Sequence, residues 1–75
     1  METNCKSSSI LIKVNGESKF IPYNSSILNL LESCKIKQDR VVIELNRKIL
    51  KKEDFPYSLL KTNDEVEIVT FVGGG

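Results

Sequence analysis

The chain contains no histidine among its 75 residues. It therefore lacks the commonest general base and the commonest metal ligand of proteins, and it cannot form a Ser-His or Cys-His nucleophile pair. The carboxylates show no paired pattern that would replace this chemistry. We therefore expect a protein that is not an enzyme and that holds neither a metal nor another bound cofactor.

Cysteine is almost as scarce, with only Cys5 and Cys34 in the chain. The two are far apart and have no metal-ligand spacing, so a disulfide framework is not expected and a reducing compartment is favoured. Cys34 falls on the apolar side of a predicted helix and is interpreted as a small core residue. Cys5 lies in a polar, serine-rich leader and is interpreted as a free thiol.

An excess of charge of either sign is also missing. Lys plus Arg number 11 against 10 Asp plus Glu, a formal net charge of +1. This balance gives no argument for a nucleic acid or an anionic membrane as partner, and no apolar run approaches the roughly 18–20 residues that span a bilayer. We expect a protein that is a monomer when free and located in the cytoplasm, or in the plastid stroma if it is encoded in or imported into a plastid.

The first half of the chain shows two strand patterns followed by a helix pattern. Residues 9–14 and 17–23 alternate in polarity around Asn15-Gly16, a strong hairpin signal because a type I′ turn needs positive φ at both central residues. Pro22 makes the second strand an edge strand. Residues 24–26 then offer N-cap side chains for a helix over 27–35, whose apolar residues recur at helical spacing.

The second half contains a clear strand at 40–46, a brief strand at Ile49-Leu50 and a final strand after the turn at 62–64. Between them, residues 55–60 have no clean period. We interpret them as irregular or 3₁₀ structure that places Phe55 and Leu59 under the sheet. The core is predicted to include Ile12, Val14, Ile27, Leu31, Ile43, Leu45, Val66 and Ile68.

The chain ends in Gly73-Gly74-Gly75, directly after the final strand pattern. Three residues without a Cβ make a thin tether that accepts φ of either sign, and fully extended they reach roughly 10 Å. Such a tail can carry the carboxylate of Gly75 away from the domain and into the active site of another protein. The alternative is a frayed end without function, which is common at chain termini.

The order of elements predicts an α+β fold of the ubiquitin-like β-grasp type. A mixed sheet of four to five strands would carry one helix across one face, with the two terminal strands parallel at its centre. We expect residues 1–9 to form a disordered N-terminal extension, residues 10–72 the β-grasp domain and residues 73–75 a flexible tail.

This arrangement resembles the ubiquitin-like sulfur carriers, and most closely the ThiS type of thiamine biosynthesis. The resemblance covers residues 10–75. It is carried by the turn Val14-Asn15-Gly16, the strand 41–46, the segment 60–69 and the ending Phe71-Val72-Gly73-Gly74-Gly75. One departure is Asn46-Arg47, where the family often has Asn-Gly, and it concerns the geometry of that turn.

The resemblance implies a specific chemistry at the end of the chain. The carboxylate of Gly75 would be adenylated at the expense of ATP, which the activating partner uses, and then converted to a thiocarboxylate that donates sulfur for thiazole formation. Gly73 and Gly74 would thread the partner's active site. The implied partners are an E1-like adenylyltransferase, thiazole synthase and a sulfur-donating enzyme such as a cysteine desulfurase.

The polarity of the strands also predicts a docking surface. If Val66, Ile68, Thr70 and Val72 face the helix, then Val69 and Phe71 face away, as do Leu11 on the first strand and Val42 on the third. Adjacent Leu11, Val69 and Phe71 would form a partner-binding patch beside the tail. The alternative is that Phe71 folds back over an edge of the core.

Three other functions stay open at this point. The small subunit of molybdopterin synthase shares the fold, the tail and the thiocarboxylate. A ubiquitin-like modifier would instead form isopeptide bonds with lysines, and a plain interaction module would have an inert tail.

Overall fold

The computed structural model describes residues 9–71, and the flanking residues 1–8 and 72–75 lie outside that part of the chain. Most of the predicted N-terminal extension and the whole glycine tail therefore lie outside the described residues. The elements are β1 (Ser9–Val14), β2 (Glu17–Pro22), α1 (Ile27–Ser33), η2 (Gln38–Arg40), β3 (Val41–Leu45), β4 (Lys48–Leu50), η3 (Lys52–Asp54) and β5 (Glu65–Thr70). Ser9, assigned above to the extension, is the first residue of β1.

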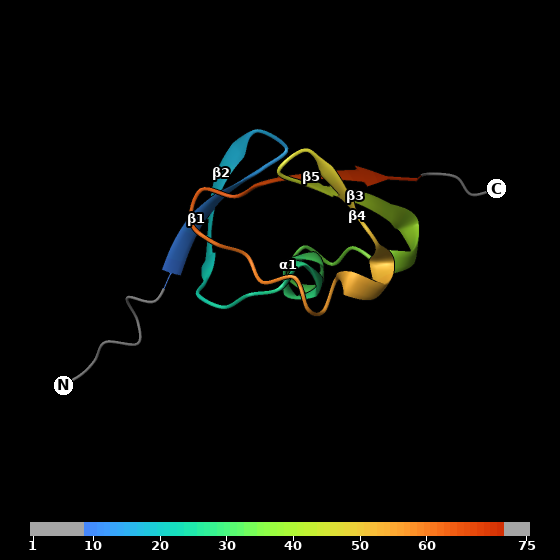
Figure 1. Ribbon diagram of the computed structural model, residues 1–75, viewed down its shortest axis with the longest axis horizontal. Coiled ribbons are helices and arrows are strands. Elements are labelled where there is room, and N and C mark those ends of the chain that lie inside the picture. The colour runs from blue at the N-terminus through green and yellow to red at the C-terminus, as the bar shows by residue number, and fades with distance from the viewer. Residues whose placement is uncertain (1–8, 72–75) are drawn as a thin grey trace.

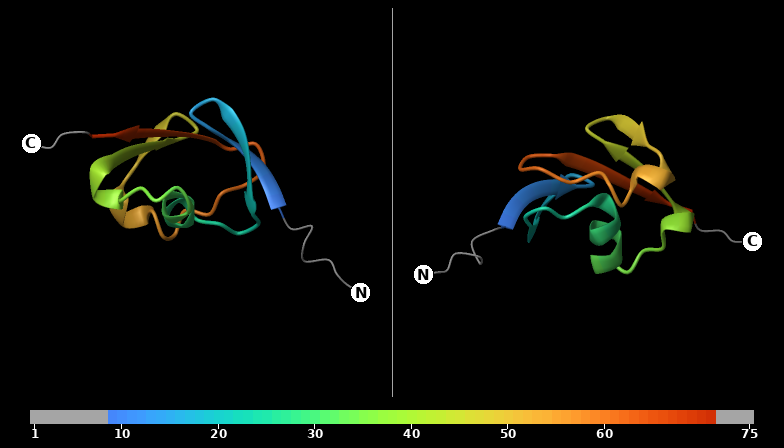
Figure 2. Two further views of the ribbon diagram at one scale, coloured as in Figure 1. Left: turned by 180° about the vertical axis from the view of Figure 1, so that it is seen from behind. Right: turned by 60° about the horizontal axis from the view of Figure 1, so that its bottom comes forward.

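The five strands form one mixed sheet in the order β2-β1-β5-β3-β4. The terminal strands β1 and β5 are parallel at its centre, and the other neighbours are antiparallel. Helix α1 lies across one face and leaves the other uncovered (Figures 1 and 2). The predicted fold class is confirmed, and β2, which ends at Pro22, is an edge strand as expected.

Both hairpins turn through left-handed backbone, and the two turns flank the first half of β5, one on its β1 side and one on its β3 side (Figure 1). Asn15 and Gly16 have φ of 52° and 86°, and Asn46 and Arg47 have φ of 53° and 71°. These pairs of positive angles are those of a type I′ turn. Arg47 therefore adopts the conformation that glycine would take more easily.

Helix α1 begins at a capping box. The Ser26 hydroxyl accepts from the Asn29 N–H at 3.1 Å, and the Asn29 Oδ1 accepts from the Ser26 N–H at 2.9 Å. The helix ends at Ser33, two residues before the predicted end, because Lys35 turns to a φ of 60°. Cys34 is the C-cap, and it packs half-buried against the core.

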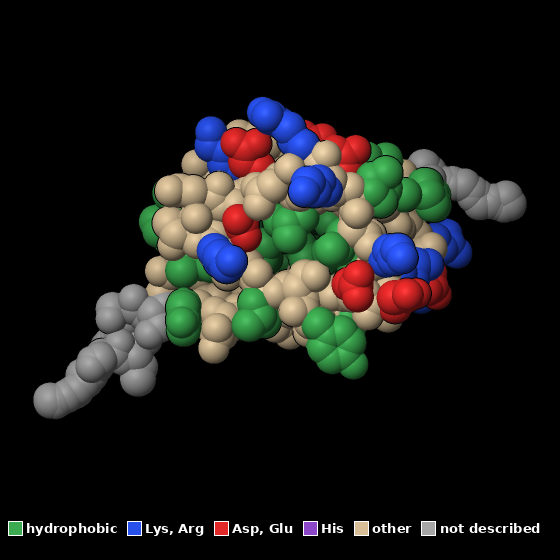
Figure 3. Space-filling view, in the orientation of Figure 1, with side chains coloured by type: hydrophobic (Ala, Val, Ile, Leu, Met, Phe, Trp, Pro, Cys, Tyr) green, Lys and Arg blue, Asp and Glu red, His purple; other side chains and the backbone are tan. Residues whose placement is uncertain are grey.

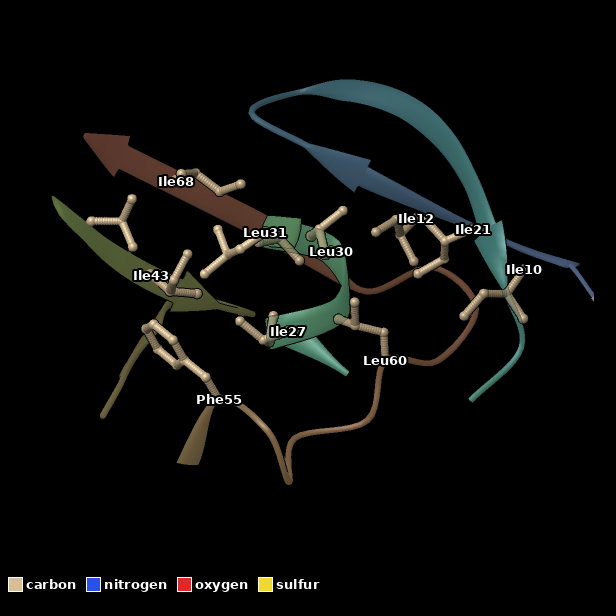
Figure 4. Packing of buried hydrophobic residues seen from close by; sticks show 12 residues of the cluster. Ile10, Ile12, Ile21, Ile27, Leu30, Leu31, Ile43, Phe55, Leu60 and Ile68 are labelled. Atoms are coloured by element: carbon tan, nitrogen blue, oxygen red, sulfur yellow. The ribbon is translucent and has the colours of Figure 1, made fainter. Parts of the chain in front are cut away.

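The core lies between α1 and the sheet, and Figure 4 shows its apolar side chains converging there. Six of the predicted core residues are buried, namely Ile12, Ile27, Leu31, Ile43, Val66 and Ile68, and Val14 and Leu45 are half-buried at its margin. The other buried apolar side chains are Ile10, Ile21, Leu30, Val41, Phe55 and Leu60.

The segment before β5 corrects one prediction. Phe55 is buried as expected, but Leu59 is 49% exposed and its neighbour Leu60 is buried with 3% exposure. The cause is a backbone bond from the Leu60 N–H to the Ser25 carbonyl at 2.8 Å, beside a bridge between Leu59 and Ser26. These contacts hold the segment along the start of α1 and direct Leu60 inward. Residues 55–60 are irregular, which was one of the two predicted forms, and the 3₁₀ turn η3 lies just before them.

Candidate functional site: the outer face of the sheet beside the exit of β5

Strand β5 leads from the centre of the sheet toward the C-terminal end of the chain, on the side opposite the start of β1 (Figure 1). The residues predicted to carry sulfur and to thread a partner, Gly75 with Gly73 and Gly74, lie outside the described residues. Phe71, the last described residue, donates its N–H to the Arg40 carbonyl at 2.8 Å. The chain is therefore held on the β3 side of β5 as far as Phe71, the last described residue.

The side-chain alternation predicted for β5 is confirmed as far as Phe71, while Val72 lies outside the described residues. Val66 and Ile68 are buried against the helix side, whereas Val69 and Phe71 are each 54% exposed. Phe71 is therefore not one of the buried residues of the core. Thr70 has the same orientation as Ile68 but is exposed.

The predicted position of Leu11 beside Val69 and Phe71 is wrong. In the parallel pair of β1 and β5, Lys13 lies opposite Glu65, and the Leu11 carbonyl accepts from the Asn63 N–H at 2.8 Å. Leu11 thus lies beside the start of β5. Val69 follows Glu65 by four residues, roughly 13 Å at about 3.3 Å per residue. Polarity assigns the face of a strand but not the register of a parallel pair.

The neighbour of Val69 on the outer face is Val42, its antiparallel partner on β3. Val42, Val69 and Phe71 form what we call the tail-proximal patch. Figure 3 shows hydrophobic side chains gathered next to the grey C-terminal segment. The polarity pattern already placed Val42 on this face. To predict the patch, one would also have needed to know that β3 pairs with β5 in the antiparallel direction. Leu11 instead pairs with Phe20 at the other end of the face.

Two carboxylates lie next to the patch. Glu44 and Glu67 are direct cross-strand partners on β3 and β5. They form the next pair on the same face after Val42 and Val69. Within residues 9–71 the ion pair with an N–O distance inside 4.0 Å joins Lys52 Nζ to Asp39 Oδ1 at 3.9 Å, away from these glutamates. Like charges directly opposite each other destabilise a sheet. The outer face near the tail is therefore both apolar and acidic.

The described part of the chain shows no group of three or more Cys, Asp or Glu side chains placed to hold a metal ion. Among the same residues, no helix has the length and apolar character needed to cross a membrane. The described features near the tail are thus a strand that leads to it and an exposed patch, with no assembled catalytic group among them.

Together, this fold and this face define a ubiquitin-like β-grasp domain whose C-terminal strand lies at the centre of the sheet and contributes to its outer face. The model of the ThiS family matches residues 12–75. The chain belongs to the ThiS family of small sulfur carrier proteins.

Individual relatives agree with this assignment. The chain is 35% identical over 66 residues to the sulfur carrier protein ThiS of Bacillus subtilis (strain 168), covering 87% of this chain and 100% of that protein. It is 36% identical over 70 residues to the uncharacterized protein ycf40 of Porphyra purpurea, covering 88% of this chain and 93% of the relative. The crystal structure of the thiamine biosynthesis protein ThiS from Geobacter metallireducens is similar with a TM-score of 0.75 and 32% identity, over 88% of this chain and 100% of that one.

Proposed function

We propose that this chain carries sulfur for thiazole formation in thiamine biosynthesis, with the sulfur held at the carboxyl group of Gly75. The observation that carries the proposal is the family match, which runs to residue 75 and so includes the three glycines. The Bacillus relative is named a sulfur carrier protein, and the name of the Geobacter relative, a thiamine biosynthesis protein, favours the thiamine pathway. The tail-proximal patch supplies a surface for a partner at the root of the tail.

The chemistry proceeds in three steps. A carboxylate is a poor acyl donor, so an oxygen of Gly75 attacks the α-phosphate of ATP, which releases pyrophosphate and leaves an acyl-adenylate. A persulfide sulfur then forms a bond to the carbonyl carbon and expels AMP, which leaves an acyl disulfide. A thiol cleaves the S–S bond of that acyl disulfide, is itself oxidised to a disulfide, and leaves the thiocarboxylate on Gly75. The carrier supplies the reacting carboxyl group, while the partner binds ATP and performs the catalysis.

Three partners follow from this sequence of steps. An E1-like adenylyltransferase activates Gly75, an enzyme such as a cysteine desulfurase supplies the sulfur, and thiazole synthase accepts it. The adenylyltransferase and the synthase both need Gly75 in their active sites. We therefore assign the tail-proximal patch of Val42, Val69 and Phe71 to their docking, since exposed apolar patches mark such surfaces.

The same proposal includes a location. The relatives named ycf40 in Porphyra purpurea and Pyropia yezoensis carry a name that suggests a plastid-encoded protein. This favours the plastid stroma over the cytoplasm for this chain.

The decisive experiment is intact-mass spectrometry of the chain purified together with its native partners. We expect the mass change of one oxygen replaced by sulfur, located at Gly75 by fragmentation. Adducts on lysines of other proteins would indicate a modifier, and an unchanged mass would indicate an inert tail. Stable co-purification with one large subunit, with transfer of sulfur to a molybdopterin precursor, would favour the molybdopterin synthase subunit instead.

A second experiment tests the tail through partner-dependent ATP–pyrophosphate exchange. Gly74→Val should abolish exchange, because a β-branched side chain makes the tail wider and restricts its backbone. One residue added after Gly75 should do the same, because it moves the carboxylate by roughly 3.5 Å. Neither change replaces one of the buried residues of the described core, so we expect melting temperatures that match the wild type. Wild-type exchange by both variants would show that the tail is not the substrate.

A further inference from the structure

The half of β5 nearest the tail has a neighbouring strand on one side only. On its β3 side, β5 is paired from Val66 to Thr70. On its β1 side, pairing covers only Glu65 and Val66, because β1 ends at Val14 and the chain turns away. The backbone of β5 beyond Val66 thus needs another partner on this side, or it becomes an edge.

The side chain of Asn15 takes the place of the missing strand residues. Its backbone N–H donates to the Val66 carbonyl at 2.8 Å. Its side-chain Oδ1 accepts from the Ile68 N–H at 2.7 Å, and its Nδ2 donates to the Ile68 carbonyl at 3.2 Å. A primary amide has a donor and an acceptor side by side. One side chain therefore supplies both bonds to Ile68, which in a continued parallel pair would come from two different residues of β1.

Asn46 makes a similar set of bonds on the opposite side of β5, at its beginning. Its backbone N–H donates to the Glu65 carbonyl at 2.8 Å, and its Oδ1 accepts from the Glu65 N–H at 2.9 Å. Its Nδ2 donates to Asp64 Oδ1 at 3.1 Å. Both asparagines are the first left-handed residue of a hairpin turn, with φ of 52° and 53°. They differ in position, since Asn46 holds the start of β5 and Asn15 holds Ile68, nearer the tail.

We propose that Asn15 is a positioning residue for the carrier reaction, because its side chain fixes Ile68 and thereby the direction in which β5 delivers the tail to the activating enzyme. This inference rests on the proposed function. Adenylation needs the carboxylate at one place in the active site, and a misplacement of about 1 Å can reduce a rate about 100-fold. If Asn15 served stability alone, Asn46 would be its equivalent.

The experiment compares Asn15→Gly with Asn46→Gly in the full chain. Glycine adopts positive φ readily, so both turns keep their backbone geometry while each loses one amide side chain. Hydrogen exchange measured by NMR should show the Ile68 amide exchanging about tenfold faster or more in Asn15→Gly, with the Glu65 amide unaffected. In Asn46→Gly the Glu65 amide should instead exchange faster, and the Ile68 amide should be unaffected. Urea unfolding of both variants provides the correction for global stability.

The functional measurement is ATP–pyrophosphate exchange with the adenylyltransferase encoded in the same genome, over a range of carrier concentrations. Asn15→Gly should lower kcat about fivefold or more while the KM for the carrier stays near the wild-type value, because the patch is intact. Asn46→Gly should leave both constants near wild type. Asn15→Asp keeps the acceptor for the Ile68 N–H and should recover part of the lost kcat.

Four results would overturn the inference. The first is a kcat loss in both glycine variants that simply follows their loss of stability, and the second is an unchanged Ile68 amide in Asn15→Gly. If the wild-type chain itself supports no exchange, the proposed function fails and the positioning role fails with it. Faster Ile68 exchange together with a wild-type kcat would leave the proposed function standing and refute the positioning role alone.

Discussion

Leu59 and Leu60 are adjacent, chemically identical and differently buried, so they offer a sharp test of how the segment before β5 packs. Leu60 is 3% exposed and Leu59 is 49% exposed. The contacts that hold them are made by the backbone, through the bond from Leu60 to Ser25 and the bridge of Leu59 with Ser26. Replacing either leucine by alanine therefore removes side-chain atoms and leaves these contacts in place.

The two substitutions should lower the free energy of unfolding by amounts that differ several-fold. Leu60→Ala deletes a buried side chain and should cost about 2–5 kcal/mol, with the spread set by how far the cavity collapses. A chain of this length has roughly 4–11 kcal/mol of stability at about 0.05–0.15 kcal/mol per residue. A loss of about 3 kcal/mol lowers the melting temperature of such a domain by roughly 12–24 °C. Leu59→Ala removes a side chain already half in water and should cost about 1 kcal/mol or less.

Urea unfolding followed by far-ultraviolet circular dichroism measures both variants against the wild type. The slope of free energy against urea should stay the same, so that the midpoints report stability directly. A cost for Leu60→Ala below about 1 kcal/mol, or a larger cost for Leu59→Ala than for Leu60→Ala, would refute the inward direction of Leu60. The second result would also return the burial to Leu59, as predicted from the sequence.

Three further changes test the helix face, the patch and the acidic pair. Leu31→Ala should lower the free energy of unfolding in urea by about 2–5 kcal/mol, and a loss below about 1 kcal/mol would show that the buried face of α1 is assigned incorrectly. Phe71→Ala should leave the melting temperature nearly unchanged and weaken binding to the adenylyltransferase in a titration, whereas Leu11→Ala should not weaken it; equal weakening would refute the patch. Glu67→Gln should raise the free energy of unfolding by about 0.2–1 kcal/mol by relieving the repulsion with Glu44, less so at high salt, and a decrease would mean that the carboxylate has a favourable partner.

The sequence by itself determined the local elements and the side-chain phase of the strands. Polarity alternation predicted which residues of β5 face the helix, and Val66, Ile68, Val69 and Phe71 lie as that pattern indicates. Asn15-Gly16 predicted the first hairpin, and Ser26 forms the predicted helix cap. These features depend on residues within a few positions of one another, so the pattern contains the information that specifies them.

The tertiary structure alone decided the features that join distant residues. A hairpin turn sets the register of an antiparallel pair, but no turn links β1 to β5, so polarity could not show that Leu11 lies far from Val69. The choice of Leu60 over Leu59 came from a bond to Ser25, 35 residues earlier in the chain. The bonds of Asn15 to Ile68 span 53 residues and exist only because β1 stops where β5 continues. Such contacts depend on where whole strands come to lie, which no local pattern of polarity encodes.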